Sequence, residues 1–177
     1  MKGKILDVGC GNHKVPGSLG LDFVKVPGVD IVHDLNKIPY PFKENTFDII
    51  HANQVLEHLD PPLDKILGEL CRICKPDGRI KILVPHAASI GAFSDSTHKK
   101  FFTYNTFDDF GLSEQSYYTK TRVKIIKRKF LYLTGRKSSK LLSPISWVAN
   151  KIPLIYSHFL AFIFPISTIY FELKPVK

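Results

Sequence analysis

The sequence of 177 residues contains three cysteines and shows no apolar targeting segment at its start. An odd number of cysteines without regular spacing argues against a disulfide framework and favours a reducing compartment. The opening residues, MKGKILDVG, pass directly into a strand-like run and offer neither the apolar region nor the cleavage site of a signal peptide. We therefore expect a cytoplasmic protein, and one domain spanning residues 1–177, because a chain of this length buries one core.

Acidic residues are absent from residues 115–171, which hold ten lysines and arginines. Residues 1–114 hold 13 basic and 15 acidic side chains, so the formal net charge of +9 arises in the second half of the chain. A basic segment without acids favours a polyanionic partner, either nucleic acid or an anionic membrane surface. An ordinary solvated face has the same composition and remains an alternative.

Short apolar runs alternate with polar segments and predict seven strands. One helix is predicted at residues 61–78, where leucine and isoleucine recur at helical spacing before the stop signal Lys75-Pro76-Asp77-Gly78. Cys71 and Cys74 extend its apolar face, so we interpret them as core residues and not as half of a zinc site. The predicted strands are 4–8, 18–23, 29–35, 47–53, 79–85, 121–135 and 167–176.

The stretch ILDVGCG at residues 5–11 lacks the third glycine of a dinucleotide-binding loop. Lys14 stands where that glycine belongs, and only about ten residues separate Val8 from Leu19, which leaves little room for a crossover helix. NAD and FAD are therefore disfavoured as ligands. A nucleoside without phosphates fits better, because Asp22 can accept hydrogen bonds from ribose hydroxyls and Asp34 from an adenine amino group.

Four stretches, ILDVGCG, LGLDF, VHDLNKIPYPFKENTFDIIHANQVLEHL and LCRICKPDGRIKILVP, resemble the class I S-adenosylmethionine-dependent methyltransferases. More narrowly, they are similar to a small microbial group of these enzymes. The resemblance implies an α/β, Rossmann-like sheet of seven strands, mostly parallel with an antiparallel last strand. The short connections here imply reduced helices between the first three strands.

The resemblance also implies S-adenosyl-L-methionine as the cofactor and assigns its contacts. Asp7, Gly9 and Gly11 shape the loop around the methionine moiety, with Cys10 between the glycines. Asp22 holds the ribose and is followed by Phe23. Asp34 and Leu35 border the adenine, and Asn53 and Gln54 line the far wall.

Methyl transfer needs a general base only when the acceptor must lose a proton, because the sulfonium methyl is already an activated electrophile and positioning supplies most of the rate. For a hydroxyl acceptor the candidate bases are His58, His86 and His98, each of which can equally be a hydrogen-bonded packing residue. Residues 91–107 resemble an element of the same group that covers the acceptor site. Asp95 with His86 and His98 raises the question of a metal ion, but their irregular spacing leads us to expect none.

An insertion at residues 134–166 separates the last two predicted strands. No charge occurs from Ile152 to Phe171, yet Pro153 and Pro165 leave too short a helix between them to span a membrane. An interfacial membrane element, a lid and a dimer contact all fit this segment. Its basic and aromatic character favours a glycan, lipid-linked or small-molecule hydroxyl as acceptor. Alternatives are a nucleic-acid methyltransferase, although no recognised binding module is present, and a non-catalytic cofactor-binding or membrane-associated protein.

Overall fold

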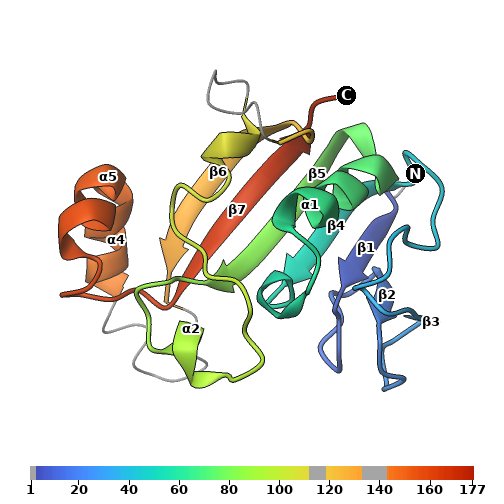
Figure 1. Ribbon diagram of the computed structural model, residues 1–177, viewed down its shortest axis with the longest axis horizontal. Coiled ribbons are helices and arrows are strands. Elements are labelled where there is room, and N and C mark those ends of the chain that lie inside the picture. Colours follow the sequence, from blue (N-terminus) through green and yellow to red (C-terminus); the bar gives the residue numbers. More distant parts are fainter. Residues whose placement is uncertain (1–2, 112–118, 133–142) are drawn as a thin grey trace.

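The computed structural model describes residues 3–111, 119–132 and 143–177, which form one seven-stranded sheet of order β3-β2-β1-β4-β5-β7-β6 (Figure 1). All neighbouring strands run parallel except β7, which is antiparallel to both β5 and β6. This arrangement confirms the predicted fold class. The strands are β1 (Ile5–Val8), β2 (Leu19–Asp22), β3 (Ile31–Val32), β4 (Phe47–Asn53), β5 (Cys74–Pro85), β6 (Val123–Leu131) and β7 (Thr168–Pro175).

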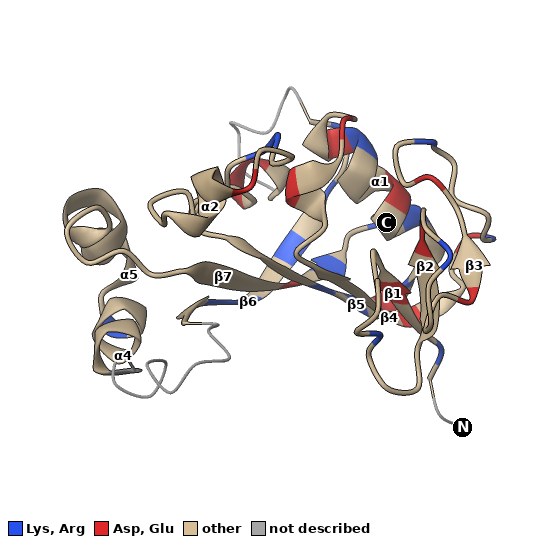
Figure 2. Ribbon diagram, turned by 90° about the horizontal axis from the view of Figure 1, so that it is seen from below, with Lys and Arg blue, Asp and Glu red and all other residues tan. Residues whose placement is uncertain are grey.

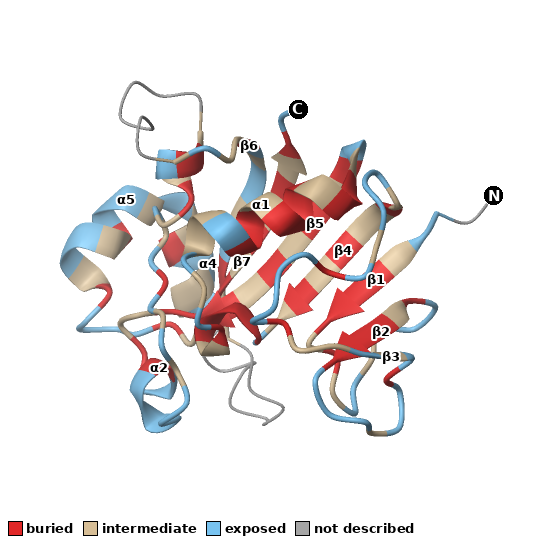
Figure 3. Cartoon of the chain, turned by 45° about the vertical axis from the view of Figure 1, so that its right-hand side comes forward, coloured by how far each residue is buried: buried red, intermediate tan, exposed pale blue. Residues whose placement is uncertain are grey.

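Helix α1 (Leu63–Ile73) covers one face of the sheet and lies within the predicted helical segment. Its apolar side chains recur at three- and four-residue spacing and are buried against the sheet, as the burial colouring of Figure 3 shows. Each leucine or isoleucine buried in this way contributes about 1.5–3 kcal/mol. Cys71 and Cys74 are buried thiols, in agreement with their interpretation as core residues.

Three predicted strand boundaries are wrong, one of them that of the sixth strand, which was predicted at residues 121–135 and comprises Val123–Leu131. The third strand was expected at residues 29–35 but comprises only Ile31–Val32, because the Asp34 carboxylate accepts a hydrogen bond from Asn36 N at 3.0 Å and turns the chain away from the sheet. The turn predicted at residues 75–78 is wrong as well, because these residues belong to β5, which pairs with β4 at Cys74 and again from Arg79 onward.

The connections after β1 and β2 contain turns and no helix, as the short spacing predicted. Helix α1 and the single turn α2 (Gly91–Ser94) lie on the same side of the sheet, in front of it in Figure 1 and above it in Figure 2. On the other side, β5 and β7 present side chains that are only partly buried, among them Arg79, Lys81, Tyr170 and Lys174. Within the described ranges, the sheet is covered by helices mainly on one face.

Between β6 and β7 the chain forms α4 (Ser143–Lys151), α5 (Pro153–Ile155) and the π-helical turn Tyr156–Leu160. The Asn150 amide fastens α4 to β6: its Oδ1 accepts from Phe130 N and its Nδ2 donates to Phe130 O, both at 2.9 Å. None of the helices in the described part of the chain combines the length and hydrophobicity that a membrane span requires. Part of the basic character of this insertion comes from Arg136, Lys137 and Lys140, which lie outside the described residues.

Candidate functional site: two adjoining pockets at the carboxyl ends of the strands

The glycine loop after β1 requires glycine for steric reasons. Gly9 has a φ of 66°, and a Cβ at this position would lie 2.3 Å from Val55 Cγ2. Gly11 has a φ of 47° and faces open space, with no heavy atom within 4 Å of the position that a Cβ would take. A left-handed backbone is accessible to glycine at little cost, so these residues shape a concave loop over the ends of β1 and β2.

Two buried carboxylates hold this loop in place. Asp7 accepts a hydrogen bond from Val15 N at 2.7 Å, and burial raises the pKa of its carboxyl group despite that bond. Asp22, at the end of β2, accepts from Gly11 N at 2.9 Å through Oδ2 and from Phe23 N at 2.7 Å through Oδ1. Oδ1 also accepts from Val24 N at 3.3 Å, whereas Oδ2 has one partner and retains acceptor capacity, so Asp22 can brace the loop and still bind a ligand hydroxyl.

A pocket of about 430 Å³ opens beside the loop, at the carboxyl ends of the parallel strands where α/β sheets bind ligands. Six of the predicted cofactor residues come together in its wall beside His58, a predicted candidate base. The rest of the wall was not singled out from the sequence and consists of Asn36, Val55, Leu59 and Thr97. The six predicted residues are Gly9, Asp22, Phe23, Asp34, Leu35 and Gln54.

The other four predicted cofactor residues do not line this pocket. Asp7 and Cys10 are buried beneath the loop, where the Cys10 thiol faces Gly28 O at 3.9 Å. Gly11 contributes its backbone N–H to Asp22. Asn53 follows the buried Ala52 on β4, so its side chain lies toward the opposite face of the sheet.

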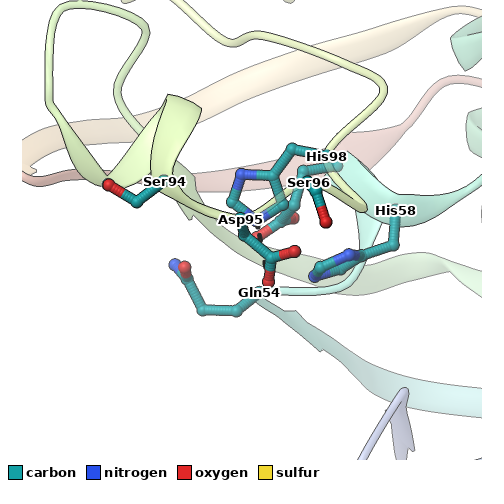
Figure 4. Close-up of a pocket in the computed structure, with 8 residues that line it drawn as sticks. Gln54, His58, Ser94, Asp95, Ser96 and His98 are labelled. Carbon is teal, nitrogen blue, oxygen red and sulfur yellow. Dashed lines mark ion pairs between the residues drawn. The ribbon is translucent and has the colours of Figure 1, made fainter.

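A second pocket, of about 520 Å³, adjoins the first and shares Gln54 and His58 with it. Figure 4 shows Gln54, His58, Ser94, Asp95, Ser96 and His98 converging on this space. Gln54 has a φ of 51°, an uncommon conformation for a residue with a side chain, and its N–H donates to Leu83 O at 2.7 Å. The strained residue thus stands where the two pockets meet.

His58 and His98 lie together in the second pocket, with ring centroids 4.7 Å apart. His98 Nδ1 is 2.9 Å from Ala92 O, and His58 Nδ1 is 2.8 Å from Thr97 Oγ1. Burial, followed by the nearby His98, lowers the pKa of His58, so this imidazole is neutral near pH 7. The predicted loop at residues 91–107 therefore does bring a histidine to the pocket.

Glu57 is the residue that the sequence-based reasoning missed. It lies in the short 3₁₀ turn η1 (Leu56–His58), has an exposed fraction of 0%, and lines the second pocket. Neither carboxylate oxygen has a hydrogen-bond partner among the described residues, and burial raises its pKa to about 7. The available signal was an acid in an otherwise apolar run, VLEHL, since an acid buried there needs a partner or a function.

His86 is separated from the other two histidines. It is buried between Phe130 and Tyr156, with ring centroids 5.4 and 6.4 Å away, and lines neither of the two pockets. Burial lowers the pKa of its imidazole, partly offset by a hydrogen bond to the backbone of Ile166. In this position His86 packs β5 against the segment between β6 and β7.

The sheet has the Rossmann-like fold of the class I methyltransferase type. Its marks are the strand order, the single antiparallel strand, the glycine loop after β1 and Asp22 at the end of β2. A family model described as a methyltransferase domain matches residues 1–123, and the chain therefore belongs to this family. This family is the one that the sequence resemblance implied.

Individual relatives are more distant. An uncharacterized methyltransferase of Schizosaccharomyces pombe is 30% identical over 44% of this chain and 38% of its own length, so the matched part spans well under half of that relative. A methyltransferase structure from Archaeoglobus fulgidus superposes with a TM-score of 0.61 at 20% identity, covering 97% of this chain and 85% of the other. One from Mesorhizobium loti gives 0.59 at 14% identity, covering 97% and 90%. At these identities the structures support the fold.

Proposed function

We propose that S-adenosylmethionine binds in the 430 Å³ pocket and that the adjoining 520 Å³ pocket holds the acceptor. The observation that supports this assignment is that Gln54 and His58 line both pockets, so that a cofactor in one pocket and an acceptor in the other would be neighbours. Asp22 is positioned to hold the ribose hydroxyls. Asp34 and Leu35 border the adenine end, and Gly9 allows close backbone approach.

The acceptor that fits best is a hydroxyl group of a glycan, a lipid-linked molecule or a small metabolite. When bound, S-adenosylmethionine supplies a methyl group on a positively charged sulfur, so that a hydroxyl acceptor leaves one proton to be removed. His58 and His98 line the acceptor pocket, and either imidazole is positioned to take that proton. His86, which is enclosed among aromatic rings, is not part of this proposal.

An exposed apolar surface favours an acceptor presented at a lipid surface. Phe162 and Phe159 on the segment between β6 and β7 have exposed fractions of 84% and 73%, and Lys151 lies 5.7 Å from the centre of the Trp147 ring. Apolar and aromatic side chains with a basic border are typical of peripheral elements that rest on anionic membranes. Further exposed side chains of this surface are Leu154, Ile155, Ile163 and Phe164.

A thermal-shift comparison tests the cofactor assignment. S-adenosylhomocysteine should raise the melting temperature in a concentration-dependent way, because a ligand that binds only the native state stabilises it by mass action, whereas NAD should have no effect. Stabilisation by NAD alone would contradict the proposal. The acceptor class is then tested by offering radiolabelled S-adenosylmethionine with separated glycan, lipid and nucleic-acid fractions, and label in nucleic acid alone would overturn the hydroxyl proposal.

A further inference from the structure

Glu57, His58 and His98 form a cluster of metal-ligand type in the wall of the 520 Å³ pocket. One ligand atom from each residue lies within 4.8 Å of the others. A transition-metal ion binds imidazole nitrogen and carboxylate oxygen at about 2.0–2.2 Å, so small side-chain rotations bring all three ligand atoms onto one ion. Two of these residues are consecutive on η1, and the third comes from the loop after α2.

The hydrogen bonds of the two histidines leave the same nitrogen available on each ring. Ala92 O can only accept, so His98 Nδ1 carries a hydrogen, and Nε2, which lies 3.9 Å from Asp95 Oδ2, is the nitrogen left for an ion. The Thr97 hydroxyl donates to Asp95 Oδ1 at 2.6 Å and therefore accepts from His58 Nδ1. A histidine that binds a metal ion usually donates its other N–H to a carbonyl, hydroxyl or carboxylate, which is the pattern found here.

Glu57 supplies the second and independent observation. Its side chain is fully buried, its carboxylate faces the pocket, and neither oxygen has a hydrogen-bond partner among the described residues. An unpaired carboxylate in such a position is costly, and a cation beside it removes that cost. Lys99 N and Lys100 N donate to the Glu57 backbone carbonyl at 2.7 and 3.1 Å, so the loop that carries His98 is fixed against the turn that carries Glu57.

We propose that Glu57, His58 and His98 bind one divalent transition-metal ion, with zinc, manganese, iron(II) and cobalt(II) as the class of ion. Two imidazoles and one carboxylate select these ions over magnesium and calcium, which prefer oxygen ligands. From the sequence we expected no metal ion, because Asp95, His86 and His98 are irregularly spaced. In the structure His86 lies apart from His98, and Glu57 and His58 lie beside it.

Three protein ligands leave coordination positions free for an atom of the acceptor. This part of the inference rests on the proposal that the 520 Å³ pocket is the acceptor site. An acceptor hydroxyl bound to the ion has a lowered pKa, so its O–H bond breaks more readily and the proton passes to water. When the ion is bound, His58 and His98 serve as its ligands, and the proton-acceptor role proposed for them above applies only to the metal-free protein. The acceptor class narrows to molecules that offer an oxygen atom to a metal ion.

Equilibrium dialysis tests the site directly. Tag-free protein, stripped with a chelator, is dialysed against Zn²⁺, Mn²⁺ or Mg²⁺, and the retained metal is measured by mass spectrometry. We expect one equivalent of Zn²⁺ or Mn²⁺ and no Mg²⁺. Absence of saturable binding of either transition metal would overturn the proposal, and retention of Mg²⁺ alone would overturn the assigned class of ion.

Variants then locate the ion. Glu57→Gln, His58→Ala and His98→Ala should each abolish stoichiometric retention, and Thr97→Val, which keeps the shape but removes the hydroxyl, should weaken affinity by about 10–100-fold. His158→Ala, outside both pockets, is the matched control and should bind as wild type. Cobalt absorption bands lost in the ligand variants but not in the control would report the same site, and unchanged binding in all three ligand variants would contradict it.

Measuring S-adenosylhomocysteine binding on the same samples separates the two proposals. If the wild type retains metal but does not bind S-adenosylhomocysteine, the cofactor pocket is wrongly assigned and the metal site is supported. If it binds S-adenosylhomocysteine but retains no metal, the metal site is contradicted and the cofactor pocket is supported.

Discussion

Replacing Asp22 with alanine should weaken the binding of S-adenosylhomocysteine by about 10- to 150-fold. The figure follows from the hydrogen bond that its carboxylate is positioned to make with a ribose hydroxyl, since bonds to charged groups contribute about 1.5–3 kcal/mol and 1.4 kcal/mol corresponds to a factor of ten. The substitution also removes the acceptor for Gly11 N, Phe23 N and Val24 N. Part of the loss could therefore arise from a loosened glycine loop.

Asp30→Ala controls for that second effect. Asp30 accepts hydrogen bonds from Gly20 N at 2.6 Å and from Lys14 Nζ at 2.7 Å, so it too braces the segment between β1 and β3, but it does not line the cofactor pocket. We expect this variant to lose stability while keeping the affinity of the wild type for S-adenosylhomocysteine. Titration calorimetry, at a temperature where circular dichroism shows both variants folded, measures the two affinities.

Two results would refute the reasoning. Wild-type affinity in the Asp22→Ala variant would show that the carboxylate does not contact the ligand. Equal losses in the Asp22 and Asp30 variants would show that loop rigidity, and not ribose recognition, determines the affinity.

Two further predictions concern regions outside the pockets. Burial lowers the pKa of His86 in the folded state, so the unfolded chain binds more protons at this residue. The free energy of unfolding should therefore fall as the pH decreases below about 6.5. Denaturant titrations should show a smaller decrease for His86→Gln than for the wild type. Replacing both Phe159 and Phe162 with serine should weaken partitioning onto anionic liposomes by about a hundredfold or more, since each inserted phenylalanine contributes about 1.5–3 kcal/mol. Sedimentation with the liposomes measures this change. If the wild type itself stays in the supernatant, the segment is a lid or a subunit contact.

Much of the sheet could be predicted because most of its strands are recognisable as short apolar runs in the sequence. Strands β1, β4 and β5 are apolar runs bounded by turn residues, and α1 shows helical spacing, so local sequence and tertiary structure agree. Strand β3 is the exception. Its predicted extension to residue 35 failed because a side-chain hydrogen bond of Asp34, which competes with strand pairing, ends the strand early.

The residues of the candidate site that follow strands could be predicted from the strand order. Those that lie on long loops could not, because the sequence does not specify the path of a loop. Gly9, Asp22 and Asp34 follow parallel strands, whose carboxyl ends meet at one edge, so their proximity follows from the strand assignment. The separation of His86 from His98 depends on how residues 87–97 travel, which no periodicity specifies. Glu57 was missed because an acid in a short apolar run carries no spacing signal of its own.

In the described part of the chain, helices cover the sheet mainly on one face. Each strand therefore has positions that tolerate substitution and positions that do not. Along β5, Ile80, Ile82 and Val84 are fully buried and alternate with Lys81 and Leu83, which are only half-buried. Replacing the first set creates cavities in close-packed surroundings, whereas the second set can exchange charge and size at little cost in stability. In the part of the chain that the structure describes, the face that helices leave uncovered can therefore acquire new surface properties without disturbing the strand ends that build the two pockets.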